Sequence, residues 1–184
     1  AEEEDEQGEH GHEGAAEAPE DDHPLWATQS TNTRSGADTW RCKECHGWDA
    51  KGVDGAYAQG SHRTGFPGIF ATTLSKEEIL TSLAETHGYR AAGLDDAALE
   101  ALAAFVQQDL LDTATLIDEA GAFRGDAARG RALYGAGLGG NKSCNTCHGG
   151  NGLKAPKGAP DDYADFVGTV ANKNPWEFLH KVRF

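Results

Sequence analysis

The sequence predicts a mostly α-helical protein made of two similar small units in tandem. The motif Cys-x-x-Cys-His occurs twice, at residues 42–46 and 144–148. Helix-capping residues and apolar residues at helical spacing recur along the chain, and no stretch shows the sustained alternation of a strand. A length of 184 residues suits one ordinary domain or two small ones.

The first unit is expected to span residues 25–113 and to hold three helical segments. Residues 39–46 should begin helical and lead into the first Cys motif. Ser75 and Glu78 form a capping box before an apolar helical side. Asp95 can cap a helix from residue 96 to about residue 111. The apolar stripe of that last helix has helical spacing and consists of Leu99, Leu102, Val106 and Leu110.

The second unit is expected to span residues 122–184, after a linker at residues 114–121. Gly125 and Asp126 should open a helix that runs to Tyr134. Asn174 and Pro175 should start another, with Asn at the cap and Pro in the first turn. We expect this unit to lack the further C-terminal helix that the first unit has.

Residues 1–24 are expected to form an acidic, flexible leader. Residues 1–22 hold 11 of the 30 acidic residues, and no Lys or Arg precedes Arg34. Such a segment has too little apolar surface to order itself, and its charge would favour basic partners. His10, His12 and His23 lie among the acids and are expected in a solvated tail, with weak metal binding as the alternative. A chain that starts at Ala1 fits removal of a signal peptide, and no apolar run is long enough to span a membrane.

The two Cys motifs carry the chemistry. Cys42 and Cys45, and likewise Cys144 and Cys147, have the spacing of thiols that attach a c-type haem through its vinyl groups. His46 and His148 follow directly and can ligate the iron. Zinc is the weaker alternative because the two Cys pairs are 98 residues apart, and a thioredoxin-like pair would need a βαβ context. We therefore expect two covalently bound haem c groups, and hence a periplasmic or otherwise extracytoplasmic location.

Around these motifs the chain resembles the class I cytochrome c family in its tandem di-haem form. The likeness covers nearly everything from Trp40 to Phe184, includes residues 41–48, 65–68, 125–134, 144–148 and 174–181, and implies two cytochrome c-like helical haem domains. It implies that Pro67 offers its carbonyl to His46, and that Pro156 or Pro160 does so for His148. Trp48 and Trp176 could line haem edges, or belong to an ordinary core.

The resemblance also indicates where the second axial ligand of the first iron should lie. Family members usually place a Met there, but this sequence contains no Met. His87 occupies the corresponding place in the loop before the last helix of the first unit. We expect His46 and His87 to ligate the first iron, with His62 as the rival for the distal position.

For the second iron three alternatives are open. The matching loop would follow Phe184, so a longer parent chain could supply a Met. His180 is a weaker candidate because it lies within the preceding helix, where a packing role is the simpler interpretation. The third alternative is an open site.

The expected function is single-electron transfer between extracytoplasmic redox partners, including a membrane-bound or larger complex. The alternatives are the haem subunit of an oxidoreductase, such as a sulfur-compound dehydrogenase or a peroxidase-like enzyme, and a protomer of a larger electron-transfer complex. An electron carrier is favoured over an enzyme. No Ser-His-Asp set, phosphate-binding Gly loop or nucleic-acid patch is evident in the sequence.

Overall fold

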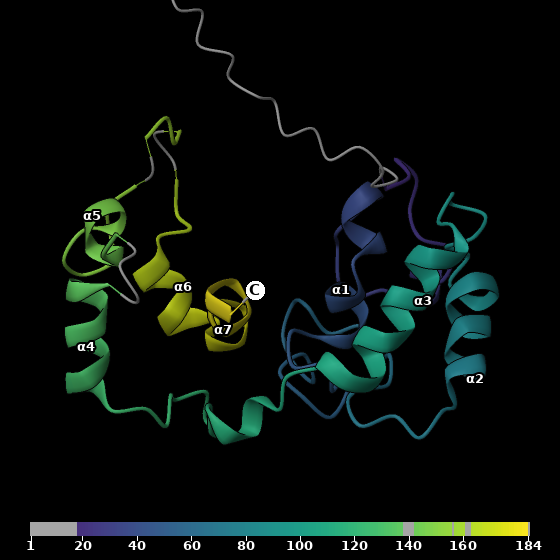
Figure 1. The fold of residues 1–184 in the computed structure, drawn as a ribbon. Coiled ribbons are helices and arrows are strands. Elements are labelled where there is room, and N and C mark those ends of the chain that lie inside the picture. Colours follow the sequence, from purple (N-terminus) through teal and green to yellow (C-terminus); the bar gives the residue numbers. More distant parts are fainter. Residues whose placement is uncertain (1–17, 138–141, 156, 161–162, 184) are drawn as a thin grey trace, which may run out of the picture.

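The computed structural model describes residues 18–137, 142–155, 157–160 and 163–183, and this part of the chain is helical. Pairing of extended backbone among these residues is limited to isolated bridges, Gly52 with Pro67 and Ile117 with Phe123. Figure 1 shows one group of helices containing α1, α2 and α3, and another containing α4 to α7, joined by an irregular linker. The prediction of a mostly α-helical protein is confirmed.

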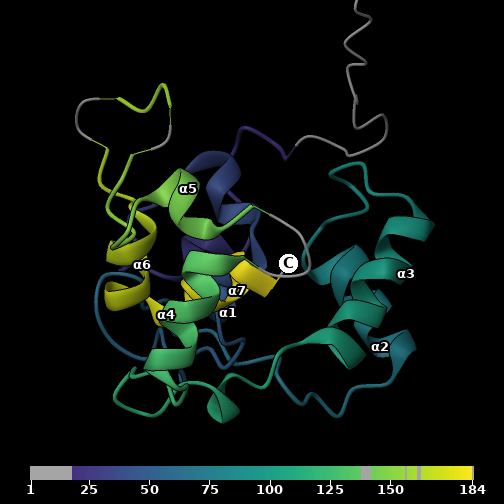
Figure 2. The same ribbon diagram turned by 60° about the vertical axis from the view of Figure 1, so that its left-hand side comes forward.

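The first group forms a small core in which α2 and α3 lie side by side, as the turned view also shows (Figure 2). Buried Leu99 and Ala103 of α3 pack against Ile79, Leu83 and Tyr89. The elements of this group are η1 (Trp26–Thr28), η2 (Gly36–Trp40), α1 (Cys42–His46), α2 (Lys76–Thr81), η3 (Ser82–Thr86), α3 (Asp96–Ala104), η4 (Phe105–Asp109) and η5 (Thr113–Thr115).

The predicted caps of this group are confirmed. The backbone N–H of Glu78 donates to Ser75 Oγ at 3.3 Å, and the N–H of Ser75 donates to Glu78 Oε2 at 2.8 Å. The N–H of Ala98 donates to Asp95 Oδ1 at 2.8 Å, which starts α3 as expected. The helix capped by Asp95 was expected to continue to about residue 111, but its α-helical part ends at Ala104. A π-helical turn follows, and the backbone is extended at Leu110.

The second group begins with the predicted helix capped by Asp126, whose Oδ1 accepts from the N–H groups of Ala128 and Arg129. The predicted helix after Asn174 is also present. The helix before it was not predicted, and its Gly168 packs closely on the loop after α5, where a Cβ would lie 2.7 Å from Asn151 O. The elements are α4 (Ala127–Ala136), α5 (Cys144–His148), α6 (Val167–Lys173) and α7 (Pro175–Arg183).

The two groups of helices differ in how many of their residues are buried. The first has a contiguous core, whereas α4, α5 and α6 contain no buried residue. Leu133 of α4 is among the exposed large apolar side chains. Within the described residues, no helix is both long and apolar enough to cross a membrane.

The described end of the acidic leader packs on the first group. Asp22 Oδ1 accepts from the N–H of Gly36 at 2.5 Å, and the indole N–H of Trp40 donates to Asp21 O at 2.8 Å. His23, which was expected in a solvated tail, is only 4% exposed. That expectation was wrong for His23. Its backbone N–H donates to Thr39 and its ring packs against Trp40, so His23 is held on the first group despite the acidic residues before it. His10 and His12 lie outside the described residues.

Ser75→Ala should lower the free energy of unfolding of the full chain by about 1 kcal/mol, because the N–H of Glu78 loses its acceptor at the start of α2. Urea unfolding followed by far-ultraviolet circular dichroism measures this. Thr73→Ala, two residues earlier in the exposed approach to the helix, is the matched control and should change stability less. Equal effects of the two substitutions would contradict the role of the cap.

Candidate cofactor-binding site

The two Cys-x-x-Cys-His motifs adopt the same local structure. Each is a five-residue helix that ends at a Gly with positive φ, +77° at Gly47 and +74° at Gly149. In each, the His carbonyl accepts from a backbone N–H six residues on: Gly52 N to His46 O is 2.7 Å, and Lys154 N to His148 O is 3.0 Å. The repeat seen in the sequence is therefore a repeat of backbone geometry.

A cavity in the first group brings four candidate residues together: Cys42, Cys45, His46 and His87. The rest of its wall is mainly apolar, and includes Leu25, Phe66, Ile69, Leu74, Ile79, Leu83, Tyr89 and Val106.

His46 is oriented by the hydrogen bond expected at Pro67. Its Nδ1 lies 2.7 Å from Pro67 O, and since a carbonyl only accepts, Nδ1 carries the proton and Nε2 keeps its lone pair. Burial, the main influence, lowers the pKa of His46, which favours the neutral ring. Gly52 allows the close approach, because a Cβ there would collide with the carbonyl of Phe66 and with Pro67.

His87 is oriented in the same manner from the opposite wall. Its Nδ1 lies 3.0 Å from Ser82 O, and its backbone N–H donates to that oxygen at 2.9 Å. The π-helical turn η3 makes this possible, because it joins residues five apart and ends directly before His87. The sequence predicted His87, but not the turn that holds it.

The centroids of the His46 and His87 rings are 6.2 Å apart, and the ring planes are inclined by 42°. Two metal–nitrogen bonds of about 2 Å, plus about 1 Å from each ring nitrogen to its centroid, give a separation of about 6 Å for two imidazoles on one metal. The spacing therefore fits a single metal ion between them.

The rival, His62, lies elsewhere. Its ring stacks on Tyr57 at 5.0 Å, and it lines a different cavity together with residues of α6 and α7. Of the two predicted distal candidates, the structure brings only His87 to the cavity that holds His46 and both thiols.

The Cys45 thiol sits in a low-polarity environment, whereas Cys42 is exposed. Burial, and then the nearby Cys42 and Glu44, raise the pKa of Cys45 to about 12, so its thiol is protonated at neutral pH. The Tyr89 hydroxyl donates to Trp40 O at 2.8 Å and lies 3.8 Å from Cys42 Sγ. Tyr89 thus connects the core under His87 to the segment that carries the thiols.

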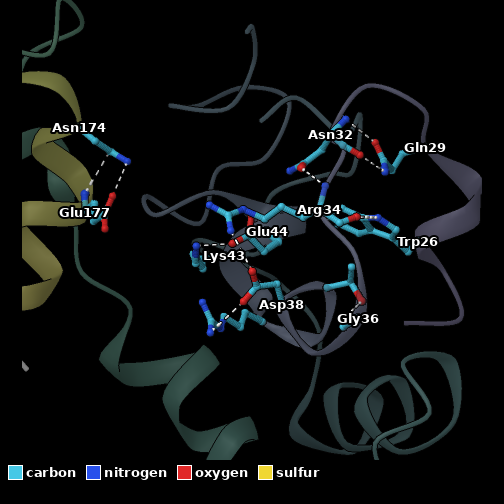
Figure 3. A network of polar contacts seen from close by, with 12 residues as sticks. Trp26, Gln29, Asn32, Arg34, Gly36, Asp38, Lys43, Glu44, Asn174 and Glu177 are labelled. Atoms are coloured by element: carbon cyan, nitrogen blue, oxygen red, sulfur yellow. Dashed lines mark hydrogen bonds and ion pairs between the residues drawn. The ribbon is translucent and has the colours of Figure 1, made fainter. Parts of the chain in front are cut away.

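Glu44, between the two thiols, is fully buried and was not singled out from the sequence. Its carboxylate pairs with Arg34 Nε at 3.3 Å and contacts Lys43 Nζ. Figure 3 shows both cationic side chains reaching Glu44. Arg34 also pairs with Asp38 at 2.9 Å, so η2 and the first motif helix are joined by one charged network.

The candidate site in the second group is less enclosed. Cys144 and Cys147 are exposed, and His148 is half-buried. The Tyr134 hydroxyl donates to Gly149 O at 2.7 Å, which ties α4 to the end of the motif helix. Of the two Pro candidates for His148, Pro160 accepts from the N–H of Tyr163 at 3.0 Å, and Pro156 lies outside the described residues.

His180, the weaker candidate for the second iron, packs against the first group. Its ring lies 5.3 Å from that of Trp48. It shares a cavity with Cys42, His46 and Trp48. The reason is that α7 turns this side of the helix toward the first group, which the sequence alone did not reveal.

The two candidate Trp residues occupy different environments. Trp48 lines the same cavity as His46, and Lys43 Nζ lies 4.9 Å above its ring. Trp176 packs on the linker, where a Cβ at Gly121 would lie 3.3 Å from its ring. It also lines cavities that include residues of the first group, such as Ala56 and Gln59.

His23 also lines the cavity of the first motif, which no sequence pattern indicated. Burial, and then the charge of His87, lower the pKa of His23, which keeps the ring neutral.

No protein-family model, curated protein or solved structure matches this chain. The interpretation of the site therefore depends on its own residues and geometry.

Arg34→Met should lower the free energy of unfolding by about 2 kcal/mol, because the buried Glu44 carboxylate loses one of its two cationic partners. Arg90→Met is the matched control. It breaks the exposed pair of Arg90 with Asp96 and should cost less than about 1 kcal/mol. Chemical unfolding of both variants gives the comparison, and an Arg34 effect no larger than that of Arg90 would contradict a structural role for the buried pair.

Proposed function

We propose that the chain is a di-haem c-type cytochrome that carries single electrons between redox partners outside the cytoplasm. In this proposal, residues 25–113 and 122–184 are two class I-like haem domains in tandem. The observation that carries the proposal is the pair of imidazoles, His46 and His87, on one cavity with both thiols of the first motif.

The residues of the first unit fit a haem. Cys42 and Cys45 would form the two thioether bonds, and His46 and His87 would hold the iron from opposite faces. Each imidazole has its Nδ1–H on a backbone carbonyl, which is the usual support for a metal-ligating histidine. The apolar wall would exclude water from the ring.

When bound, the haem supplies one-electron exchange at its iron. His46 and His87 would both be held by backbone carbonyls and would both ligate the iron, leaving no position for a substrate, which favours a carrier over an enzyme. Two imidazoles, in place of an imidazole and a thioether, favour a lower reduction potential for the same surroundings. The neutral, buried His46 and the hydrogen-bonded His87 would change little between the two oxidation states.

The second unit carries the same motif geometry at Cys144, Cys147 and His148. The exposed surfaces of α4, α5 and α6 suit a large apolar group that would cover them. A second haem, held by the two thiols and His148, accounts for both features.

The proposal is tested by producing the protein in a host that attaches haem c and measuring the intact mass. We expect the mass of the polypeptide plus two haems. Cys42→Ser/Cys45→Ser should lose one haem, and Cys144→Ser/Cys147→Ser the other. A wild-type protein with the mass of its bare polypeptide, under conditions that mature a control cytochrome, would refute the proposal.

His87→Ala should convert the first haem from low spin to high spin and let carbon monoxide bind to its reduced form, because one axial nitrogen is lost. Absorption and electron paramagnetic resonance spectra measure this. His62→Ala is the matched control and should leave the spectra unchanged, since His62 lies on a different cavity. An unchanged low-spin spectrum in His87→Ala would contradict the assigned ligand.

A further inference from the structure

His23 is a buried histidine whose position is fixed by neighbours in sequence and space. Its backbone N–H donates to Thr39 Oγ1 at 2.8 Å, and its Nδ1 accepts from the N–H of Leu25 at 3.2 Å. The Thr39 hydroxyl in turn donates to Gly36 O at 2.7 Å. The backbone of His23 is therefore attached to η2, the segment just before the first thiol, and its ring is oriented by Leu25.

The His23 ring borders the distal side of the cavity. Its centroid lies 4.7 Å from that of Trp40 and 5.8 Å from that of His87, both in edge-to-face arrangements. On another side, the His87 ring stacks on Tyr89 at 6.0 Å with an interplanar angle of 4°. Tyr89 therefore stacks on the His87 ring, and the His23 ring packs against the same ring edge to face.

The hydrogen bonds of the His23 ring do not explain why the ring is buried beside His87. Because Nδ1 accepts from Leu25, the neutral ring carries its proton on Nε2. Among the described residues, this buried Nε2 makes no hydrogen bond of standard geometry, although the His87 backbone lies close enough to interact with the ring. The His23 ring therefore interacts with both the ring and the backbone of His87, on the candidate site.

We propose that His23 is a positioning residue for the distal ligand of the first haem. Its ring blocks the space into which the His87 imidazole would move on leaving the iron. This inference rests on the proposed function, and it adds a residue from the acidic leader to the wall of the first haem site.

The test uses the full-length, haem-loaded protein. His87 must leave the iron before carbon monoxide can bind to the reduced first haem, so the binding rate reports how readily it leaves. His23→Ala should speed this binding roughly 10- to 100-fold, the range typical of lost support around a metal ligand, and should shift the resonance of the bis-imidazole haem. His23→Phe restores a ring of similar bulk and should return the rate close to that of the wild type.

Asn32→Ala is the matched control. Asn32 is also buried in the N-terminal segment, but its contacts are with Gln29 and Arg34. We expect its carbon monoxide rate to remain that of the wild type. Equal rates for His23→Ala and Asn32→Ala, or a His23→Phe variant as fast as His23→Ala, would overturn the inference.

The inference and the proposed function fail in different ways. A wild-type protein without haem, or without a bis-imidazole signal, ends the proposed function. A wild-type bis-imidazole haem that is unaffected by His23→Ala leaves the proposed function intact and ends this inference alone.

Discussion

The fixed orientation of two imidazoles is the constraint on which the proposed site depends. Each ring could rotate about its side-chain bonds, and a free histidine could present either nitrogen. The bonds from His46 Nδ1 to Pro67 O and from His87 Nδ1 to Ser82 O remove that freedom. Both rings are then left with Nε2 as the nitrogen available to a metal.

Much of the first group serves to place those two carbonyls. The bridge between Gly52 and Pro67 brings the loop after the motif back under His46. On the opposite side, the π-helical turn after α2 aims the Ser82 carbonyl at residue 87. The core under α2 and α3 then holds this turn, since Leu83 lies within it and is buried. A few local contacts therefore connect the capped helix α2 to the orientation of the His87 ring.

The sequence predicted the features that depend on local chemistry. The Cys motifs and the caps at Ser75, Asp95 and Asp126 follow from residue types at short spacings, whereas the contact of Pro67 with His46 was expected only from the resemblance to the cytochrome c family. Features that depend on packing were missed. The π-helical turns have no distinct residue pattern, and the burial of His23 contradicts its acidic surroundings. The contact of His180 with Trp48 was also not predicted, because the sequence does not reveal which side of α7 faces the first unit.

The two units are also in contact, which was not predicted. The His180 ring lies against Trp48, and the Asn174 side chain is close enough to the Tyr57 hydroxyl to lower its pKa. Burial is the larger effect on Tyr57 and raises that pKa to about 12. In the proposed cytochrome, these contacts would fix the second unit beside the first haem site.

Near-infrared magnetic circular dichroism of the oxidised, haem-loaded protein tests the central claim most directly, because the charge-transfer band of low-spin ferric haem identifies its axial ligands. The account predicts a band of bis-histidine ligation for the haem attached at Cys42 and Cys45. A spectrum in which that haem shows histidine–methionine ligation, or a high-spin iron with one histidine, would contradict it.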